Sequence, residues 1–511
     1  MQNSEAKIQR DNPGKNFSKG ARIEASNHLM LINLLKDFYR SGQLKPKQVL
    51  DHYFRKCKSS HSSSLITLNE NYYSDEKDNF ELFGIPFIAK NNFCSKSTIT
   101  TAGSKCLSRF EASYDAAVIK CLMNEGASLI GTSFLDEFAM GSAGTNSKIN
   151  NSYPLNPWSE RNVIAGGSSS GSAVSIARGL SVFSIGTDTG GSTRIPAAFC
   201  GISGFKPSFG LISRHGLIPL SNCFDCPSIF AQYTEDVGIV FQTLLSSKEN
   251  RNDATLFCQI SDKDIKLNNP KIGIVPEFFD QTHPKIVSTI DRALEMTSKN
   301  LKCSIVPQHL PTTDFILPIY KILSCVEIAS NMSPYDGIEF GTKPKANSRT
   351  FSEKIFQHRS ELIGDEVKTR ILSGNYISLL EKYEIQIAKK LWRLWCNEIH
   401  KIFQEVDFLI VPTVPIPPPT IEEYEADENS DFIIDYFTLP FNLAGLPCIS
   451  IPIGKENFSP DEQLPIGLQI IGKHGTDLKL LHFANKIEKI VKFIPLIDPV
   501  QEINDLKNKV N

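Results

Sequence analysis

Apolar residues recur along most of the chain at two spacings, one typical of helices and the other of short buried strands. Leu31, Leu34, Leu35 and Phe38 follow helical spacing, which predicts a helical pair within residues 29–56. Short apolar runs bounded by glycine, proline or polar residues predict strands at 83–89, 128–132, 182–185, 271–275, 408–411 and 467–471. Further helices are predicted at 116–125, 172–180, 380–403 and 477–491, the last with Thr476 as its N-cap, and along the stripe Ile286, Ile290, Leu294 and Leu301.

The alternation of strands and helices continues to the end of the chain, which predicts an α/β fold built in layers. No internal repeat and no long linker divides the sequence. Over 511 residues we therefore expect one large domain at 26–500, a loose N-terminal tail or leader at 1–25, and a C-terminal tail at 501–511. The stretch 141–171 is rich in Gly, Ser and Asn and is expected to be a long loop region.

Composition and charge narrow the classes of function. Apolar residues make up 41% of the chain, which excludes a disordered or collagen-like protein. The 54 Lys and Arg residues nearly balance the 56 Asp and Glu residues, for a net charge of −2. We do not expect such a chain to clamp a phosphate backbone by itself, although a partner subunit could hold the nucleic acid. The least polar stretch, residues 439–454, is too short and too interrupted by proline to predict a membrane span.

The N-terminal sequence and the cysteines give information on the cellular compartment in which the protein works. Residues 1–22 carry five basic residues and no apolar run, which fits either an organellar transit peptide or a simple tail. The 12 cysteines are scattered, which favours a reducing compartment. Cys223 and Cys226 form one C-x-x-C with no second pair, so we interpret it as incidental. The sequence has no H-E-x-x-H and no other cluster of metal ligands, and no metal is expected.

Two glycine-rich loops carry the candidate chemistry. The first, residues 166–172, reads GGSSSGS, and the second, residues 186–194, reads GTDTGGSTR. A flexible linker would be flanked by polar sequence, but the first loop runs into an apolar segment. A phosphate-binding loop would end in Gly-Lys-Ser/Thr, which is absent. Successive glycines let backbone N–H groups converge on one point, as an oxyanion hole requires, and Ser192 stands beside them as a candidate nucleophile.

A nucleophilic serine needs a base. Of the ten histidines, only His215 lies near these loops, and its Arg-His-Gly setting indicates a turn. This argues against a Ser-His-Asp triad. Lys90 stands at the end of an apolar strand, where burial would favour the neutral amine that can serve as a base. Taken alone, a lysine in this position is more often a surface residue at a strand end, and only the combination with the two loops favours the base.

The order of these segments resembles the amidase signature family. The matching segments are Gly84-Ile85-Pro86 with Lys90, Gly166-Gly167-Ser168-Ser169, and Gly186 through Ala197. Ser168 lies 24 residues before Ser192, the spacing of the two serines in that family. The resemblance implies a mixed central β-sheet sandwiched between layers of helices.

The same resemblance implies a Ser-Ser-Lys triad in which the first serine follows a cis peptide bond. Ser192 would be the nucleophile, and Ser168 would pass its proton to neutral Lys90. The backbone N–H groups of Thr189, Gly190, Gly191 and Ser192 would hold the oxyanion.

Three segments, 136–142, 335–337 and 442–447, resemble the branch of this family that hydrolyses glutamine within glutamyl-tRNA(Gln) amidotransferases. That branch implies Tyr320, Arg370 and Asp435 as the residues that bind the substrate. It also implies a heterotrimer with the B and C subunits of the amidotransferase. The B subunit would bind the tRNA and use ATP and Mg, while this chain would need no cofactor and no membrane.

The sequence departs from the bacterial pattern of this branch at several places. Asn91 stands where Asp is usual, Ser170 replaces a glycine, and the loop 222–227 is shorter. The short loop resembles the eukaryotic mitochondrial proteins, which favours a mitochondrial location over a cytoplasmic one. Two other interpretations stay open: a free-standing amidase for an apolar or aryl amide, with an apolar pocket at Arg370 and Asp435, and a non-catalytic structural subunit.

Overall fold

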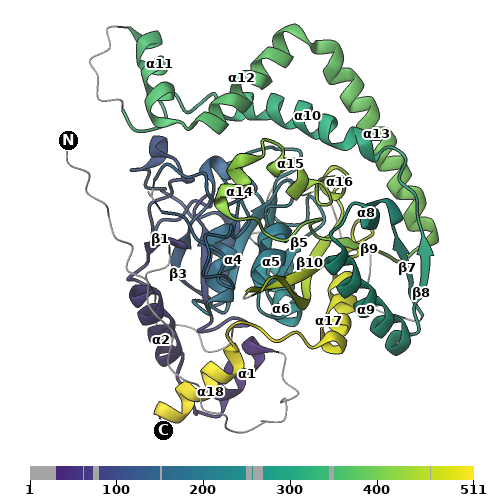
Figure 1. Cartoon of the computed structure of the whole chain (residues 1–511). Coiled ribbons are helices and arrows are strands. Elements are labelled where there is room, and N and C mark those ends of the chain that lie inside the picture. Colours follow the sequence, from purple (N-terminus) through teal and green to yellow (C-terminus); the bar gives the residue numbers. More distant parts are fainter. Residues whose placement is uncertain are drawn as a thin grey trace.

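The computed structural model describes residues 30–510 apart from 61–62, 73–79, 150–151, 249–255, 257–259, 261–266, 268, 344–349 and 461. In these residues the strands form one mixed eleven-stranded sheet, in the order β1-β3-β2-β4-β6-β5-β10-β11-β9-β7-β8. The sheet runs across the middle of Figure 1. The strands are β1 Leu65–Leu68, β2 Pro86–Lys90, β3 Ser128–Ser133, β4 Phe183–Asp188, β5 Ser203–Lys206, β6 Cys226–Ala231, β7 Lys271–Ile274, β8 Ser304–Pro307, β9 Phe408–Pro412, β10 Cys448–Ser459 and β11 Glu462–Gly472.

Strand direction changes along the sheet. Strand β2 pairs in parallel with β3 and β4, and β7 pairs in parallel with β8 and β9. The central strands β4, β6, β5, β10, β11 and β9 pair with one another in antiparallel fashion. The mixed sheet with helices on both faces is the predicted fold class.

Helices cover both faces of the sheet. On one face α4 and α5 pack together, and on the other α3, α6, α17 and α9 lie side by side. The helices are α1 Leu31–Arg40, α2 Pro46–Ser59, α3 Ala117–Asn124, α4 Ser170–Ala177, α5 Arg194–Cys200, α6 Thr234–Ser246, α8 Pro276–Asp280, α9 Pro284–Leu301, α10 Ile316–Asn331, α11 Phe351–Leu362, α12 Asp365–Leu380, α13 Lys382–Glu405, α14 Ile421–Ala426, α15 Ser430–Asp435, α16 Leu439–Leu443, α17 Asp477–Val491 and α18 Pro499–Val510.

The two faces of the sheet have separate cores because successive side chains of a strand point to opposite sides. In β6, Ile229 belongs to the large core under α6 and α17, while Phe230 belongs to a smaller core with α4 and α5. The smaller side is packed closely. A Cβ on Gly204 or Gly467 would lie 2.5 Å from the side chain of Ala197 or Ala198 on α5, so α5 rests almost directly on the sheet.

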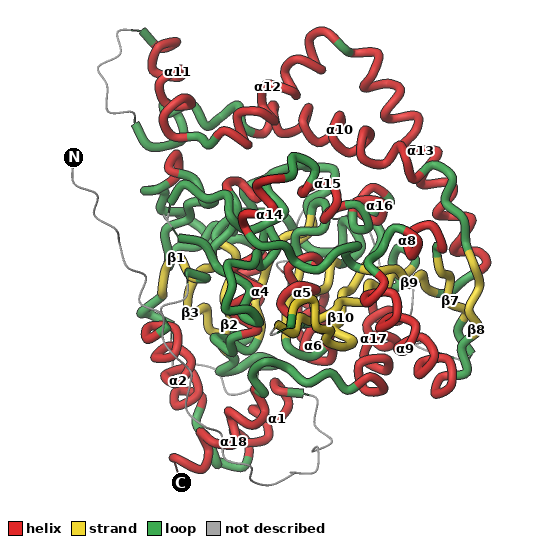
Figure 2. The backbone as a smooth tube through the Cα atoms, viewed as in Figure 1, coloured by secondary structure: helices red, strands yellow, loops and turns green. Residues whose placement is uncertain are grey.

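Helices α10 to α13 lie above the body of the molecule in Figure 2. The apolar pattern predicts no element between 302 and 379, where α10, α11 and α12 form. One reason is that α12 leaves Leu372, Leu379 and Leu380 exposed, so its apolar residues do not follow a single buried stripe. No described helix is long and apolar enough to cross a bilayer.

Other predicted elements were displaced by a few residues or bonded differently. Strand β4 continues through Gly186 to Asp188, which the sequence pattern placed in a loop, and α4 begins at Ser170 rather than 172. Thr476 is the N-cap of α17, but its hydroxyl donates to the carbonyl of Lys473 instead of capping the helix. The predicted N-terminal tail or leader at 1–25 lies outside the described residues.

The expectation of a C-terminal tail at 501–511 is wrong for residues 501–510, which belong to α18. Ile503 is fully buried in the large core, and Leu506 is nearly so. Glu502 accepts hydrogen bonds of 2.6 and 2.8 Å from Lys56 on α2. The helix packs against α1, far away in the sequence, and its apolar stripe joins the large core, so distant contacts stabilise it.

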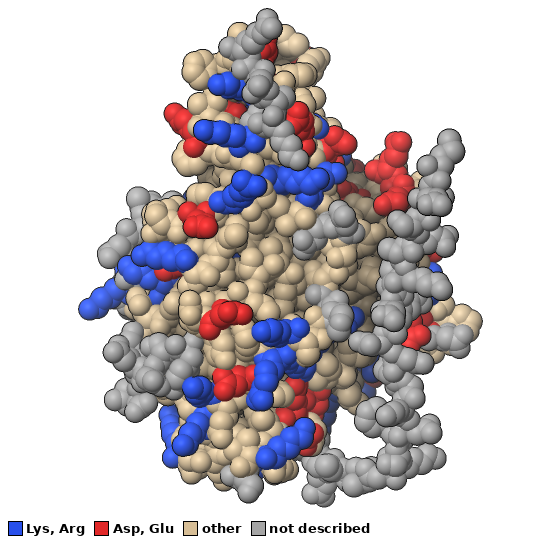
Figure 3. Space-filling model, turned by 90° about the vertical axis from the view of Figure 1, so that its left-hand side faces the viewer, with Lys and Arg blue, Asp and Glu red and all other residues tan. Residues whose placement is uncertain are grey.

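Positive and negative side chains are interspersed on the face of the molecule shown in Figure 3. This face therefore presents no broad field of one sign, in keeping with the balanced composition.

We predict that Ile503→Ala lowers the free energy of unfolding by about 2–4 kcal/mol, because it leaves a cavity between α18 and the helices it covers. Urea denaturation of the purified chain measures this. The exposed Asn508→Ala is the matched control and should change stability by less than about 0.5 kcal/mol. Equal effects of the two substitutions would show that α18 is not docked as described.

Candidate active site

Lys90 is the last residue of β2 and its side chain is completely buried. Its Nζ lies 2.8 Å from Ser168 Oγ, 2.9 Å from Ser169 Oγ and 2.8 Å from Thr187 Oγ1. No described carboxylate forms an ion pair with Lys90. Burial lowers the pKa of Lys90 to about 7, with partial opposition from more distant carboxylates such as Asp136. A substantial fraction of the amine is therefore neutral near pH 7.

The hydrogen bonds around Lys90 distinguish the neighbouring serines. A neutral amine has two N–H donors and one lone pair. Ser169 Oγ already donates to the Thr187 carbonyl at 3.1 Å, so Ser169 accepts from Lys90. The lone pair of Lys90 is left for the hydroxyl of Ser168 or Thr187. The Gly167–Ser168 peptide bond is cis, as the resemblance implies.

Asp136 supports the loop that carries Ser168, and its sequence context gave it no predicted role. Its buried carboxylate accepts the backbone amides of Gly144 at 3.1 Å and Asn146 at 2.8 Å. The backbone amide of Asp136 donates to the Ser168 carbonyl at 3.3 Å. Any side chain at Gly167 would collide with the Asp136 carboxylate, so only glycine fits before Ser168.

Ser192 stands in the short loop between β4 and α5. Its carbonyl accepts the Ser169 amide at 3.3 Å, which ties the two glycine-rich loops together. The Ser192 hydroxyl faces a cavity and makes no hydrogen bond to any residue the structure describes. A Cβ on Gly190 would lie 3.0 Å from the Tyr320 hydroxyl, and one on Gly191 would collide with Thr438. Both glycines let the backbone approach these groups closely.

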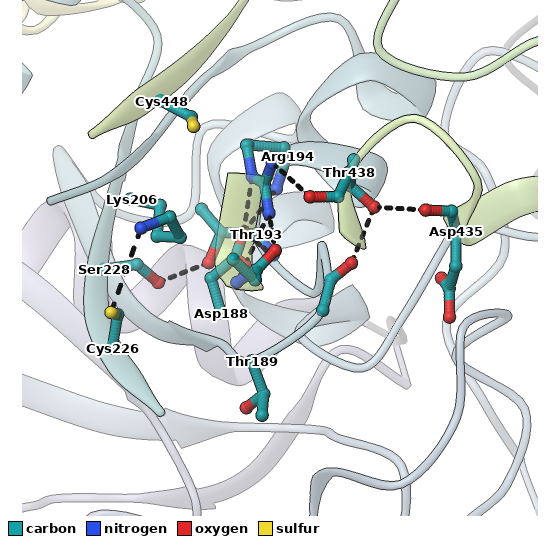
Figure 4. Close-up of polar contacts among 12 residues, drawn as sticks. Asp188, Thr189, Thr193, Arg194, Lys206, Cys226, Ser228, Asp435, Thr438 and Cys448 are labelled. Carbon is teal, nitrogen blue, oxygen red and sulfur yellow. Dashed lines mark hydrogen bonds and ion pairs between the residues drawn. The ribbon is translucent and has the colours of Figure 1, made fainter. Parts of the chain in front are cut away.

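A buried ion pair fixes both ends of this loop (Figure 4). Arg194 Nε and Nη2 donate to the two carboxylate oxygens of Asp188 at 2.9 and 2.8 Å, and neither side chain is exposed. Arg194 also donates to Gln469 Oε1 at 2.5 Å, to the Thr438 carbonyl at 3.1 Å and to Asn442 Oδ1. Burial alone would raise the pKa of Asp188, but Arg194 lowers it to about 2.

Thr438 connects the loop to the rim of the cavity. Its hydroxyl oxygen lies 2.6 Å from the Gly190 carbonyl and 2.9 Å from the Asp435 carbonyl. Figure 4 shows the contact between Thr438 and Asp435. The backbone segment of the expected oxyanion hole is thereby held against the end of α15.

The loop forms the floor of a cavity of about 330 Å³. Thr189, Gly190 and Ser192 line this floor, and Tyr320 on α10, Arg370 on α12 and Asp435 on α15 line the walls, whereas Gly191 is not among the lining residues. The structure thus brings together five predicted site residues with Ser192, from segments up to 246 residues apart. Lys90 and Ser168 are completely buried and are not among the residues that line the cavity.

The walls carry basic and acidic side chains. Arg370 Nε donates to Glu366 at 2.7 Å. Burial opposes the charge on Arg370, but Glu366 and other neighbours more than offset it and raise its pKa. Burial, reinforced by Asp431, raises the pKa of Asp435 well above its usual range. The Tyr320 side chain is almost fully buried, and burial raises its pKa.

One of the departures noted in the sequence, Asn91, has a structural explanation. The Asn91 amide donates to the Ile99 carbonyl at 2.8 Å and to Thr132 Oγ1 at 2.7 Å, and its oxygen accepts two bonds of 2.6 Å from Thr101. A carboxylate could not make the two donor contacts. Cys223 and Cys226 are both free thiols.

The residues around the ion pair were missed by sequence reasoning, although a signal was present. Between residues 163 and 205 the chain has only three charged residues, Arg178, Asp188 and Arg194. Opposite charges six positions apart in such an apolar segment indicate a buried pair. Nothing in the local sequence indicated Gln469 or Asn442 as the partners.

We predict that Arg194→Met destabilises the protein by about 3–5 kcal/mol, because it leaves Asp188 buried without a counter-charge. Since the folded pKa of Asp188 is depressed, the pair's contribution is present above pH ~4 and is lost as pH falls toward 2, so the difference from wild type should shrink there. Chemical denaturation at several pH values tests this. Gln469→Ala, which removes one acceptor, should cost only about 1–2 kcal/mol. Equal stability of wild type and Arg194→Met at pH 7 would contradict the assignment.

Comparison with known proteins identifies the family of the chain. Residues 58–481 match the family model described as Amidase. The chain is 37% identical over 489 residues to the A subunit of the mitochondrial glutamyl-tRNA(Gln) amidotransferase of Anopheles gambiae, covering 90% of this chain and 97% of that protein. It is 36% identical over 481 residues to the corresponding A subunit of Legionella pneumophila (strain Paris), with the same coverage of both chains. The crystal structure of the Thermotoga maritima A subunit superimposes with a TM-score of 0.73 at 27% identity, covering 90% of this chain and 96% of that one. The predicted resemblance is confirmed, and the chain belongs to the amidase family.

Proposed function

We propose that this chain hydrolyses glutamine and supplies the ammonia to a glutamyl-tRNA(Gln) amidotransferase. The main support for the proposal is that Ser192, the basic Arg370 and the acidic Asp435 line one and the same cavity. Free glutamine bears an α-carboxylate and an α-ammonium at a fixed separation from its amide. A site with both charges and a nucleophile matches that substrate.

In the proposed reaction, Ser192 Oγ attacks the side-chain amide carbon of glutamine. Its proton moves through the Ser168 hydroxyl to the neutral amine of Lys90, which explains why the base must be buried. The N–H groups of residues 189–192 stabilise the oxyanion. The C–N bond then breaks, the same relay returns a proton to the leaving nitrogen, and ammonia departs. Water hydrolyses the resulting glutamyl ester, releasing glutamate and restoring Ser192.

The relatives' names support the wider role. We propose the B and C subunits of the amidotransferase as partners in a heterotrimer, with the tRNA, ATP and Mg bound mainly by the B subunit and no cofactor bound by this chain. The near-zero net charge of the chain is consistent with tRNA binding elsewhere. The insect mitochondrial relatives support a mitochondrial location.

The free-standing amidase is the less favoured function. An enzyme for apolar or aryl amides would need an apolar pocket at Arg370 and Asp435. Both residues instead bring charge to the cavity, together with Glu366 and Asp431. The purely structural role is disfavoured because Lys90 is buried against Ser168 at the cost of its charge, an arrangement that packing alone does not require.

We predict that Ser192→Ala lowers glutamine hydrolysis by about 10³-fold or more, because the attacking oxygen is lost. Ammonia release from glutamine, measured on the complex with its partner subunits, tests this. The same variant complex should still form Gln-tRNA when ammonium chloride replaces glutamine.

Ser170→Ala is the matched control, since the buried Ser170 hydroxyl has no hydrogen-bond partner among the described residues and should be dispensable. Full glutamine-dependent activity of Ser192→Ala would overturn the catalytic assignment. Hydrolysis of aryl amides but not of glutamine by the wild type would favour the free-standing amidase.

We also predict that kcat/KM for glutamine falls about tenfold per pH unit below pH 7. Burial lowers the pKa of Lys90 to about 7, and protonation below this value removes the base. A pH profile from about 5.5 to 9 measures the limb, with circular dichroism at each pH to confirm that the protein stays folded. Asn91→Asp adds a negative charge at the residue that follows Lys90, and its attraction for the protonated amine should move the limb to higher pH. A profile that is flat down to pH 5.5 would exclude Lys90 as the base.

A further inference from the structure

Helix α15 brings a second carboxylate to the cavity, one that the sequence pattern did not single out. Asp431 and Asp435 stand one turn apart on this helix, and both line the cavity that contains Ser192. Residues four apart lie on the same face of a helix, so the two carboxylates are neighbours.

Each of the two carboxylates has one oxygen held by a hydroxyl group. The Tyr424 hydroxyl donates to Asp431 Oδ1 at 2.6 Å, and the Ser142 hydroxyl donates to Asp435 Oδ2 at 2.9 Å. Within the described residues, neither carboxylate forms an ion pair, and their other oxygens accept no hydrogen bond. These contacts orient the two side chains and leave acceptor capacity on each.

The cation on the other wall is already partnered. Arg370 is bound by Glu366 at 2.7 Å from the same helix, α12. The carboxylate of Glu366 therefore offsets much of the charge of Arg370, which attracts Asp431 and Asp435 across the cavity without forming an ion pair with either in the described residues. The α15 side of the cavity therefore lacks a bound positive charge, which a small cationic group would supply.

We propose that Asp431 is a specificity-determining residue that binds the α-ammonium of the substrate together with Asp435. This inference rests on the proposed glutamine hydrolysis and defines its substrate class: primary amides that carry a free ammonium group at the α-carbon. An ammonium has three N–H donors, so it can contact both carboxylates at once. An amide without that ammonium cannot make these two charged contacts, so its binding is weaker than that of glutamine.

The test compares glutamine with its analogue that lacks the α-amino group, glutaramate. In the Asp431→Asn complex we expect KM for glutamine to rise about tenfold while kcat stays within about twofold, since Asp431 lies on the wall and not at the reacting atoms. The ratio of kcat/KM for glutamine to that for glutaramate should fall about tenfold, because the asparagine removes a charge that only glutamine can use.

Two further variants separate this role from a structural one. Glu428→Gln removes a carboxylate of the same cavity that is solvent-exposed, and screening by water should limit its effect on KM to less than about twofold. Tyr424→Phe keeps the Asp431 charge but removes its hydrogen bond, so it should largely preserve the preference for glutamine.

Three outcomes would overturn the inference. In the first, Asp431→Asn leaves KM for glutamine and the substrate ratio unchanged. In the second, it reduces activity on both substrates equally, as general damage to the fold would. If the wild-type complex fails to hydrolyse glutamine at all, the proposed function itself fails, and this inference fails with it. An active wild type with an unchanged Asp431→Asn ratio rejects only the role of Asp431.

Discussion

The buried ion pair between Asp188 and Arg194 is the constraint on which the site depends. It joins the end of β4 to the start of α5, and the loop between them carries Ser192. Burying either charge without the other would cost much free energy, because no water is present to solvate it. The two side chains must therefore be in contact in the folded protein. Gln469, Asn442 and the Thr438 carbonyl accept from the remaining donors of the guanidinium, so β11 and α16 are drawn to the same point. The position of the nucleophile is therefore a consequence of core packing.

The same low-polarity interior has opposite effects on two charged residues. Asp188 keeps its charge because Arg194 lies in direct contact with it, and its pKa is about 2. Lys90 has hydroxyl groups in place of an ion-pair partner, and burial brings its pKa to about 7. Burial disfavours the charged form of both residues. The difference is that Asp188 has an ion-pair partner and Lys90 has only hydroxyl groups. One structural layer thus provides both a rigid support and a lysine that can accept a proton near neutral pH, without a histidine.

The cavity is formed by two parts of the molecule, the loops of its floor and the helices of its walls. The floor, with Ser192 and the glycine-rich backbone, belongs to loops anchored on the sheet. The charged walls come from α10, α12 and α15, which lie over the edge of that layer (Figure 1). The bond-breaking machinery is built from local sequence motifs. In the proposed function, substrate selection rests on Arg370, Asp431 and Asp435. The family resemblance pointed to Arg370 and Asp435, whereas the local sequence around Asp431 gave no sign that it shares their cavity.

The sequence by itself determined the elements whose burial leaves a local pattern, and the residues that stand in local motifs. Strands of the core appear as apolar runs because both faces are covered, and Lys90 and Ser192 are recognisable from the segments around them. The tertiary structure alone decided that residues 501–510 form a packed helix and that Gln469 binds Arg194, 275 positions away. A short helix or a buried polar contact is stable only through its distant partners, and no local pattern records which partners those are.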